Sequence, residues 1–537
     1  MRIADVVART LANYGARQAF GMPGGEVVTL IDALNVAGVE FTLTRQESGA
    51  AIMAAGYATA TGRPGILVTT LGPGLTNAIN GIADASQEHV PLIVLSGVVD
   101  HAVRGRYTHQ IIDQRALVRS LVKGCFEVEA EGAGAVAARA LELALAHPMG
   151  PVLIELAPAT AQTVTGLQNE LRAPPRRLNG SPSVSHEAVV EIYALLARAK
   201  RPLIVAGFDA ARGGTASALR KLAERYDIPV LTTYKAKGVL PESHPLALGA
   251  AGLSPLADRF LLPLCREADV VILAGYNPIE MRTGWLDPFD PAAQIVEISP
   301  GRYDHAMHWT NFRIEGDVGT IMTALLDCDA PASRGWSCES PSKARIELEA
   351  AFASPQPWGP HAAIDVLQQA LPEDAVVTVD SGAHRILLSQ KMTFERPLAL
   401  LQSAGFCTMG AAIPLAAGVK IADRRKPVVA VVGDGGLEMG LGDLATLRDA
   451  DLPVVVIVFQ DESLALIELK QRQASLPLAG VRLGATRFED VARACGGHGC
   501  RVTSAHDFKS ALASALSASV FSVIVCEIEA EDYAGRI

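Results

Sequence analysis

Two aspartates follow consecutive apolar segments in the last third of the chain. Asp434 lies in the run Gly433-Asp434-Gly435-Gly436, directly after the β-branched residues 428–432. Asp461 follows the next such segment, 454–459, and stands 27 positions after Asp434. That separation returns a chain to the same sheet edge after one helix and one strand. We therefore expect the two carboxylates at the ends of neighbouring parallel strands.

This arrangement suits a diphosphate and a hard cation. Glycines let the backbone approach an anion closely, and N–H groups at a helix start favour phosphate oxygens. Two carboxylates and one backbone carbonyl would form half of a magnesium shell, which diphosphate and water would complete. The same residues also suit an ordinary tight turn and an ordinary loop or N-cap aspartate. On these residues alone, both interpretations stay open.

The elements that must position these residues form three blocks. Stretches rich in Pro, Ser, Gly and charge, 173–185 and 328–342, have the composition of linkers. They predict domains at 1–172, 186–327 and 343–537. Each block alternates short β-branched runs with helical patterns, which predicts an α/β fold with three parallel-sheet, Rossmann-like domains. Residues 65–97 and 427–459 share one strand, Gly-rich turn, helix and strand pattern, and we favour a shared fold over coincidence.

Composition narrows the class of function. The net charge is −10, and no basic run is interleaved with aromatic residues, so nucleic acid is not an expected partner. The sequence contains no run of about 18 apolar residues, so it predicts no membrane span. The eight cysteines form no CxxC pair, which fits reduced thiols. We expect small-molecule chemistry in the cytoplasm.

Further motifs along the chain resemble those of thiamine diphosphate enzymes. The similarity runs nearly end to end and is nearest to the acetolactate synthase branch of the pyruvate oxidase and decarboxylase superfamily. Family motifs YPGG, RHEQGA, GPGATN, GQH and TMG are similar here to Met22-Pro23-Gly24-Gly25, Arg45-Gln46-Glu47-Ser48-Gly49-Ala50, Gly72-Pro73-Gly74-Leu75-Thr76-Asn77, Gly382-Ala383-His384 and Thr408-Met409-Gly410.

The resemblance implies an N-terminal domain that binds the aminopyrimidine, a Rossmann-like middle domain and a C-terminal domain that binds the diphosphate. It implies that Glu47 is the catalytic residue and forms a hydrogen bond with a pyrimidine ring nitrogen. It also implies that Met409 is an apolar wedge that bends the cofactor. The alternatives are a solvated glutamate and a core methionine. It implies magnesium bound by Asp434, Asp461 and Ser463. The other implied cofactor contacts are Pro23, Gly24, Asn77, Ala383, His384, Cys407, Gly433, Gly435 and Gly436.

In this family the pyrimidine and diphosphate sites of one centre belong to different subunits. The resemblance therefore implies a homodimer or homotetramer. It also implies that a 2-oxo acid is decarboxylated and that the acyl-anion equivalent passes to a carbonyl acceptor. A 2-oxo acid decarboxylase, an aldehyde lyase or a 2-hydroxyacyl-CoA lyase is the alternative. A non-catalytic homologue would require loss of the activating carboxylate, and Glu47 is present.

Several residues depart from the family pattern. Asp461 replaces an asparagine, and Cys407 replaces a glycine whose carbonyl meets the pyrimidine amine. Val98 replaces a glutamine, and His109-Gln110-Ile111 replaces FQE, which leaves specificity for pyruvate open; His109 suits either a site acid or a surface position. Ile467 stands where decarboxylases carry a protonating glutamate, unless an offset of one residue places Glu468 there.

The middle block is less informative. Gly207-Phe208-Asp209 and Lys235-Ala236-Lys237-Gly238 are similar to family stretches near FAD or ADP, yet no GxGxxG is present and Arg282 cannot be matched securely to the flavin-contacting arginine. FAD or ADP binding in the central domain is left open and is not predicted.

Overall fold

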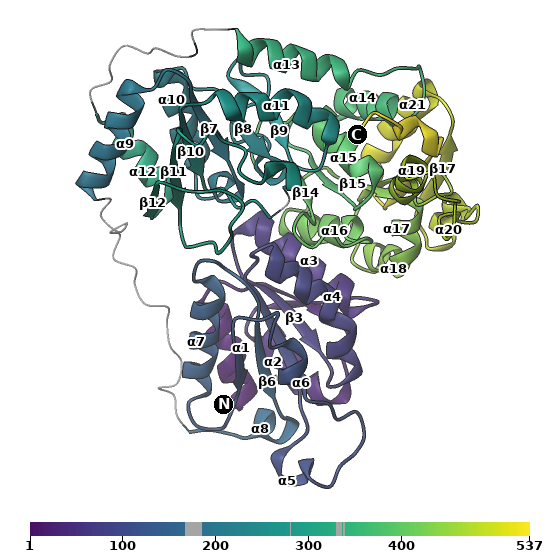
Figure 1. Ribbon diagram of the computed structural model, residues 1–537. Coiled ribbons are helices and arrows are strands. Elements are labelled where there is room, and N and C mark those ends of the chain that lie inside the picture. Colours follow the sequence, from purple (N-terminus) through teal and green to yellow (C-terminus); the bar gives the residue numbers. More distant parts are fainter. Residues whose placement is uncertain (167–184, 280, 329–335, 337–338) are drawn as a thin grey trace.

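The computed structural model describes residues 1–166, 185–279, 281–328, 336 and 339–537. Its described residues form three six-stranded sheets, each entirely parallel and each flanked by helices (Figure 1). The predicted α/β fold with three parallel-sheet domains is confirmed. In Figure 1 the purple and blue N-terminal sheet lies below the teal central sheet and the green and yellow C-terminal sheet.

The N-terminal sheet has the strand order β2-β1-β3-β4-β6-β5. Its strands are β1 (Gln18–Gly21), β2 (Glu40–Leu43), β3 (Gly65–Thr69), β4 (Leu92–Gly97), β5 (Cys125–Glu127) and β6 (Val152–Leu156). Its helices are α1 (Ile3–Asn13), α2 (Val28–Val36), α3 (Glu47–Thr61), α4 (Pro73–Gln87), α5 (His101–Arg104), α6 (Gln114–Val118), α7 (Ala133–Leu145) and α8 (Pro158–Gln162).

The C-terminal sheet has the order β14-β13-β15-β16-β18-β17. Its strands are β13 (Val376–Val379), β14 (Leu400–Gln402), β15 (Val428–Gly433), β16 (Val455–Gln460), β17 (His498–Val502) and β18 (Ser522–Glu527). Its helices are α14 (Pro360–Ala370), α15 (Ala383–Lys391), α16 (Ala412–Ala422), α17 (Asp434–Met439), α18 (Gly442–Asp449), α19 (Ala465–Gln473), α20 (Phe488–Ala494) and α21 (Ala505–Leu516), while the preceding helix α13 (Ser340–Ala351) packs against the central domain.

Counted from its own first strand, the C-terminal sheet repeats the strand order of the N-terminal sheet. The shared fold expected from residues 65–97 and 427–459 is therefore confirmed. Strands such as β15 and β16 are runs of buried valine and isoleucine because helices cover both faces of the sheet.

The central sheet has the order β12-β11-β10-β7-β8-β9, which is the 3-2-1-4-5-6 arrangement of a Rossmann fold. Its strands are β7 (Pro202–Ala206), β8 (Val230–Thr233), β9 (Ala247–Ala251), β10 (Val270–Ala274), β11 (Gln294–Ser299) and β12 (Phe312–Glu315). Its helices are α9 (His186–Arg198), α10 (Thr215–Tyr226), α11 (Pro255–Glu267) and α12 (Val318–Leu326).

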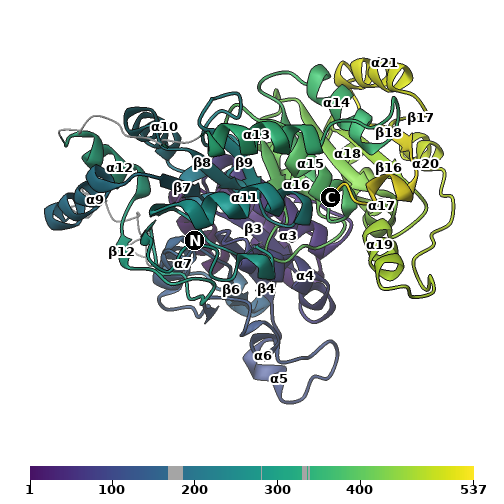
Figure 2. The same cartoon turned by 45° about the horizontal axis from the view of Figure 1, so that its top comes forward.

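Helices α3 and α16 join the N-terminal and C-terminal domains, and they lie against each other in Figures 1 and 2. A Cβ atom at Gly418 would lie 2.1 Å from the carbonyl oxygen of Met53, and one at Gly56 would lie 2.6 Å from that of Leu415. The two backbones approach this closely only because both positions are glycine.

The predicted linkers fall largely outside the described residues, which exclude 167–184, 329–335 and 337–338. Helix α13 begins at Ser340, inside the second predicted linker, and packs against α11 and β9 of the central domain. The domain boundaries stay predictions. Among the described residues, no helix has the length and apolarity that crossing a membrane requires.

Candidate active site

The C-terminal sheet reverses its strand order between β13 and β15, and ligands of such sheets bind in the crevice outside the strand ends at that point. A cavity of about 260 Å³ opens there. All ten C-terminal residues that the sequence assigned to the cofactor line it: Ala383, His384, Cys407, Met409, Gly433, Asp434, Gly435, Gly436, Asp461 and Ser463.

One wall of the cavity suits a diphosphate. Helix α17 begins at Asp434, so the glycine run presents a helix start to the cavity. A Cβ atom at Gly436 would lie 1.9 Å from an Asp380 carboxylate oxygen, so no larger residue fits. The Nε2 atom of His384 and the hydroxyl of Ser381 are buried and make no hydrogen bond within the part of the chain that the structure describes.

Burial lowers the pKa of His384 to about 3. An anion in the cavity would give both unpartnered atoms a partner, and it would raise this pKa because it favours the charged imidazole. Ser381 was not predicted from the sequence. Its position two residues after the end of β13, at the strand reversal, is the signal that could have identified it.

Two aspartates also line the cavity, at the ends of β15 and β16. Strands β15 and β16 pair with Gly433 opposite Phe459, so Asp434 and Asp461 follow neighbouring strand ends, as the spacing predicted. The Asp434 carboxylate accepts hydrogen bonds from the backbone N–H groups of Asp461 (3.2 Å) and Glu462 (2.7 Å). Burial and the nearby Asp434 charge raise the pKa of Asp461 to about 8.

A bound cation would offset this repulsion, so the pair fits a magnesium site. No group of three His, Cys, Asp or Glu side chains gathers around a metal position among the described residues, so further ligands would come from diphosphate, backbone and water. The Ser463 hydroxyl donates to Glu468 at 2.6 Å. The hydroxyl oxygen keeps lone pairs that could still bind a cation, and the carbonyl oxygen of Ser463 is the other possible ligand.

The loop beneath the cavity carries Cys407 and Met409. Cys407 adopts φ +54°, a left-handed conformation that favours the glycine found there in the family. Asp380 holds the loop by accepting hydrogen bonds from the N–H groups of Gly410 (2.9 Å) and Ala411 (3.0 Å). Burial raises the pKa of Asp380 to about 6. Asp380 also follows β13 and was not predicted.

The one-residue offset left open for α19 is resolved. Ile467 lines the cavity, whereas Glu468 is 2% exposed and is absent from the lining. The Glu468 carboxylate accepts hydrogen bonds from Ser463 and Arg472, which hold its pKa below the usual range. An apolar side chain therefore occupies this position of the cavity.

The N-terminal candidates gather at the equivalent strand reversal, between β1 and β3. Glu47 is the first residue of α3 and is only 4% exposed, which excludes the solvated alternative. It accepts a hydrogen bond from the Asn77 amide at 3.3 Å. Gly24, which follows Pro23, approaches Thr70 so closely that a Cβ atom would lie 2.2 Å from its hydroxyl oxygen.

These four N-terminal residues, all of them described, do not line the C-terminal cavity. Within one chain, the structure thus forms two half-sites at two switch points. It brings ten predicted residues together in the first and groups Glu47 with Asn77 in the second.

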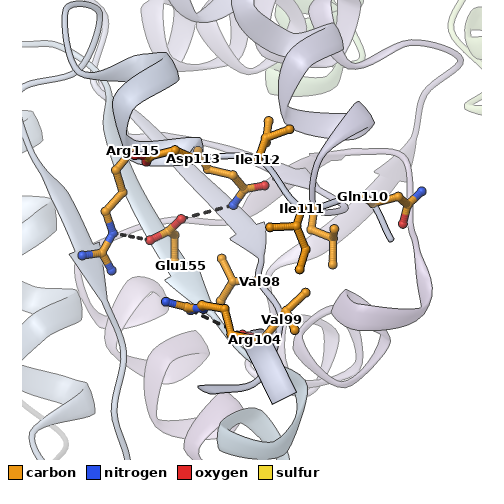
Figure 3. Close-up of a pocket in the computed structure, with 11 residues that line it drawn as sticks. Val98, Val99, Arg104, Gln110, Ile111, Ile112, Asp113, Arg115 and Glu155 are labelled. Carbon is orange, nitrogen blue, oxygen red and sulfur yellow. Dashed lines mark hydrogen bonds and ion pairs between the residues drawn. The ribbon is translucent and has the colours of Figure 1, made fainter. Parts of the chain in front are cut away.

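A second pocket, of about 330 Å³, adjoins the N-terminal half-site at Leu71 (Figure 3). Aliphatic side chains of Val98, Val99, Ile111 and Ile112 line it, with the Arg115–Glu155 pair on its polar side. Val98 and Ile111 are two of the departures from the family pattern. His109 is exposed, contacts the ring of Tyr107 and is absent from the lining, which places it at the surface.

The basic residues considered for a nucleotide in the central domain contact carboxylates of the chain itself. Lys235 pairs with Glu88 and Lys237 with Glu242, while Arg282 pairs with Asp258 at 3.0 Å. Lys235 also lies over the Phe208 ring, 3.9 Å from its centroid. These contacts give no reason to predict a flavin.

Comparison with known proteins agrees with this geometry. Models described as the N-terminal, central and C-terminal domains of thiamine pyrophosphate (thiamine diphosphate) enzymes match residues 1–117, 189–325 and 380–526. The chain belongs to the thiamine pyrophosphate enzymes and is acetolactate synthase-like.

Individual relatives place it within that family. The large subunit of acetolactate synthase isozyme 3 of Escherichia coli is 29% identical over 534 residues, which cover 96% of this chain and 92% of the relative. A probable acetolactate synthase large subunit of Methanocaldococcus jannaschii is 30% identical over 486 residues, covering 87% and 81% respectively.

Proposed function

We propose that the protein uses thiamine diphosphate and Mg²⁺ to decarboxylate a 2-oxo acid and to transfer the acyl-anion equivalent to a carbonyl acceptor. The observation that carries this proposal is the cavity between β13 and β15. There a glycine cradle, two unpartnered buried polar atoms and two strand-end carboxylates face one space. This donor set matches a diphosphate and its cation.

In this proposal Ala383, His384 and the Gly433–Gly436 run hold the diphosphate, and Asp434, Asp461 and Ser463 hold the cation. Cys407 and Met409 support the cofactor from below, while Pro23, Gly24, Asn77 and Glu47 bind the pyrimidine. Bound thiamine diphosphate supplies a carbon nucleophile and an electron sink for decarboxylation. The Glu47 carboxyl group would share a proton with the pyrimidine nitrogen of the bound cofactor.

Ile467 favours carbon–carbon ligation over release of an aldehyde. An isoleucine side chain cannot donate a proton, and it occupies the position where decarboxylases of the superfamily carry a protonating glutamate. A carbonyl acceptor can then capture the acyl group before a proton does. The alternative functions are a 2-oxo acid decarboxylase, an aldehyde lyase and a 2-hydroxyacyl-CoA lyase.

The proposal includes at least a homodimer, because none of the four N-terminal candidates lines the C-terminal cavity of the same chain. Exposed apolar side chains flank both halves: Val103, Tyr107, Ile111, Ile112 and Leu117 near the N-terminal half, and Phe406, Met439, Ile467, Leu476 and Leu478 near the other. A two-fold dimer that places the first group on the second would bury both and complete two centres. Pairing of dimers into a homotetramer and a cytoplasmic location stay predictions.

Incubation of the purified protein with thiamine diphosphate, Mg²⁺ and a panel of 2-oxo acids tests the function. Products are separated as acyloin, free aldehyde or CoA ester, with and without an added aldehyde or 2-oxo acid acceptor. Ligation predicts an acyloin as the main product. Aldehyde alone would instead establish a decarboxylase or an aldehyde lyase. A parallel incubation with a 2-hydroxyacyl-CoA tests the remaining alternative, which would cleave it to an aldehyde and a shorter CoA ester.

A further inference from the structure

The turn before α4 positions the partners of Glu47. Gly72 adopts φ +62° and ψ −105°, and a Cβ atom there would lie 2.5 Å from the carbonyl oxygen of Gln110. Helix α4 then contacts both carboxylate oxygens of Glu47. A Cβ atom at Gly74 would lie 3.4 Å from one oxygen, and the Asn77 amide donates a hydrogen bond to the other. The environment of Glu47 therefore depends on how the Gly72 turn is held.

Gln114 holds this turn with its side-chain amide. The Gly72 N–H donates to the Gln114 Oε1 atom at 2.9 Å, in a buried hydrogen bond. The Gln114 Nε2 atom donates to the Gly97 carbonyl and to Glu155, both at 3.2 Å. Gln114 is 5% exposed, so these bonds do not compete with bulk water. One amide thus connects the Gly72 turn to the ends of β4 and β6.

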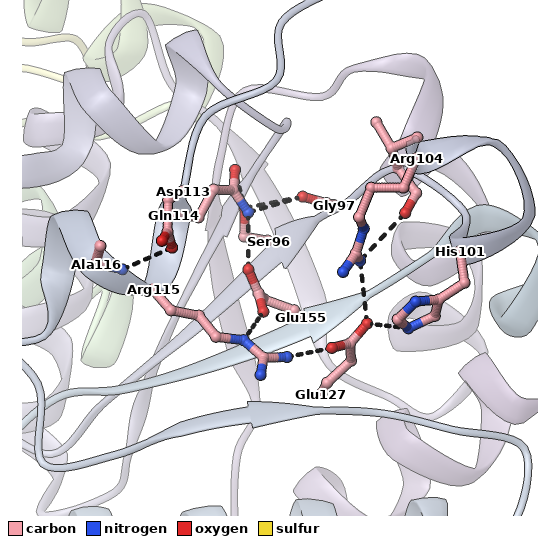
Figure 4. A network of polar contacts seen from close by, with 11 residues as sticks. Ser96, Gly97, His101, Arg104, Asp113, Gln114, Arg115, Ala116, Glu127 and Glu155 are labelled. Atoms are coloured by element: carbon pink, nitrogen blue, oxygen red, sulfur yellow. Dashed lines mark hydrogen bonds and ion pairs between the residues drawn. The ribbon is translucent and has the colours of Figure 1, made fainter. Parts of the chain in front are cut away.

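Glu155 determines which way the amide faces. An ionised carboxylate can only accept hydrogen bonds, so the Gln114 nitrogen must face it and the oxygen must face Gly72. The other Glu155 oxygen accepts from Arg115 at 2.5 Å. Arg115 also pairs with Glu127, which His101 (2.6 Å) and Arg104 (3.1 Å) contact as well (Figure 4). This network of ion pairs holds the Glu155 carboxylate in place.

We propose that Gln114 is a positioning residue for Glu47. Gln114 acts on Glu47 through the Gly72 turn, and Glu155 sets the orientation of the Gln114 side-chain amide. Gln114 borders the second pocket, but it does not line the C-terminal cavity, and its side-chain hydrogen bonds within the described residues go to Gly72, Gly97, Glu155 and Ser96 rather than to Glu47. The inference rests on the proposed function, because it assumes that Glu47 activates bound thiamine diphosphate. Small displacements of a catalytic group reduce rate more than affinity.

The first test compares Gln114→Ala with Gln369→Ala, a matched control at an exposed glutamine of α14. Three quantities are measured in each holoenzyme: the affinity for thiamine diphosphate with Mg²⁺, the hydrogen–deuterium exchange rate at C2 of the bound cofactor, and kcat and KM for a 2-oxo acid. We expect exchange and kcat to fall together by about tenfold or more in Gln114→Ala, since a buried N–H loses its acceptor. KM and the control should stay near wild type.

The second test uses variants that keep the size of the side chain at position 114. It therefore separates the effect of hydrogen-bond orientation from the effect of lost packing. Gln114→Glu keeps an acceptor for Gly72 but sets two carboxylates against each other, so exchange should slow. Adding Glu155→Gln supplies a new amide that can donate to the carboxylate introduced at position 114 while its oxygen accepts from Arg115. The double variant should therefore recover most of the exchange rate. A merely structural role for the pair would not produce this recovery in folded, cofactor-loaded protein.

Wild-type exchange rates in Gln114→Ala and Gln114→Glu would overturn the positioning role and leave the proposed function intact. So would a double variant no faster than Gln114→Glu, or a loss confined to cofactor affinity. A wild-type protein that binds thiamine diphosphate without accelerating C2 exchange would overturn the proposed function itself. The two failures are therefore distinguishable.

Discussion

At the scale of single residues, Glu47 combines burial with few hydrogen bonds. A buried carboxylate is costly unless partners complete its bonding, and the Asn77 amide donates to this one at 3.3 Å. A pyrimidine nitrogen would add a further partner. The burial of Glu47 at the start of α3 therefore suits a carboxyl group that binds a ligand rather than solvent.

Replacing Glu47 by Gln should reduce turnover by roughly 10²–10⁴-fold, because an amide cannot exchange a proton with the pyrimidine. Thiamine diphosphate affinity should change little, since the diphosphate and cation contacts lie in the other half-site. Steady-state kinetics and calorimetric titration of the cofactor measure the two effects. Unchanged turnover would reject the role assigned to Glu47.

Replacing Ile467 by Glu should raise the share of free aldehyde among the products. The new carboxyl group would face the cavity, where it could protonate the acyl-anion equivalent before an acceptor captures it. Chromatography of products from one 2-oxo acid measures the share. Ile467→Gln is the control of similar size without an acidic proton, and an equal aldehyde share in both variants would contradict the explanation.

The sequence predicted the cavity residues well, because glycines and strand-end aspartates carry their chemistry in local spacing. It missed Asp380 and Ser381, which act through loops that are distant in the chain and stand in no motif. It identified Cys407 as a replacement for a glycine of the family pattern. Only the fold shows that the position is left-handed.

At the scale of elements, the same strand order in the first and third sheets gives the molecule two equivalent switch points. The alternation of strands and helices made the α/β fold and the shared pattern predictable. The packing of α3 on α16 was not predictable from the sequence. It depends on close backbone contact at Gly56 and Gly418, which belong to helices separated by more than 350 residues of sequence.

Gly418→Ala tests this packing. In most helices Gly→Ala is stabilising by about 1 kcal/mol, but here the new methyl group would meet the Met53 carbonyl. We expect a loss of about 1–3 kcal/mol in the free energy of unfolding, as for overpacked cores. Denaturant unfolding measures it, with Gly166→Ala, where nothing lies within 4 Å, as the control. A stabilised Gly418→Ala variant would show that the helices are not in close contact.

At the scale of the whole molecule, a buried acid links the N-terminal and C-terminal domains. The Ser403 hydroxyl donates to Asp84 on α4. Burial, and next the charge of Glu88, raise the pKa of Asp84 to about 7 despite the opposing effects of Ser403 and Lys235. The junction therefore contains a carboxyl group whose protonated form is favoured by folding.

This shift predicts how stability depends on pH. An unfolded aspartate has a pKa of about 3.9, so the stabilising contribution is complete below about pH 4 and is lost as the pH rises through about 7. Asp84→Asn stays neutral and still accepts from Ser403. The melting temperature of Asp84→Asn should therefore increase relative to that of wild type as the pH is raised from 5.5 to 8. Parallel melting curves across this range would contradict the assignment.

The proposed function requires one thiamine diphosphate bound between the C-terminal half-site of one subunit and the Glu47 half-site of a second subunit. The most direct test is a crystal structure of the protein with thiamine diphosphate and Mn²⁺, whose anomalous scattering locates the cation. We predict diphosphate density between His384 and Gly436, a cation between Asp434 and Asp461, and the pyrimidine against the partner's Glu47. A cavity that stays empty at saturating cofactor, or a cofactor bound elsewhere, would contradict the account.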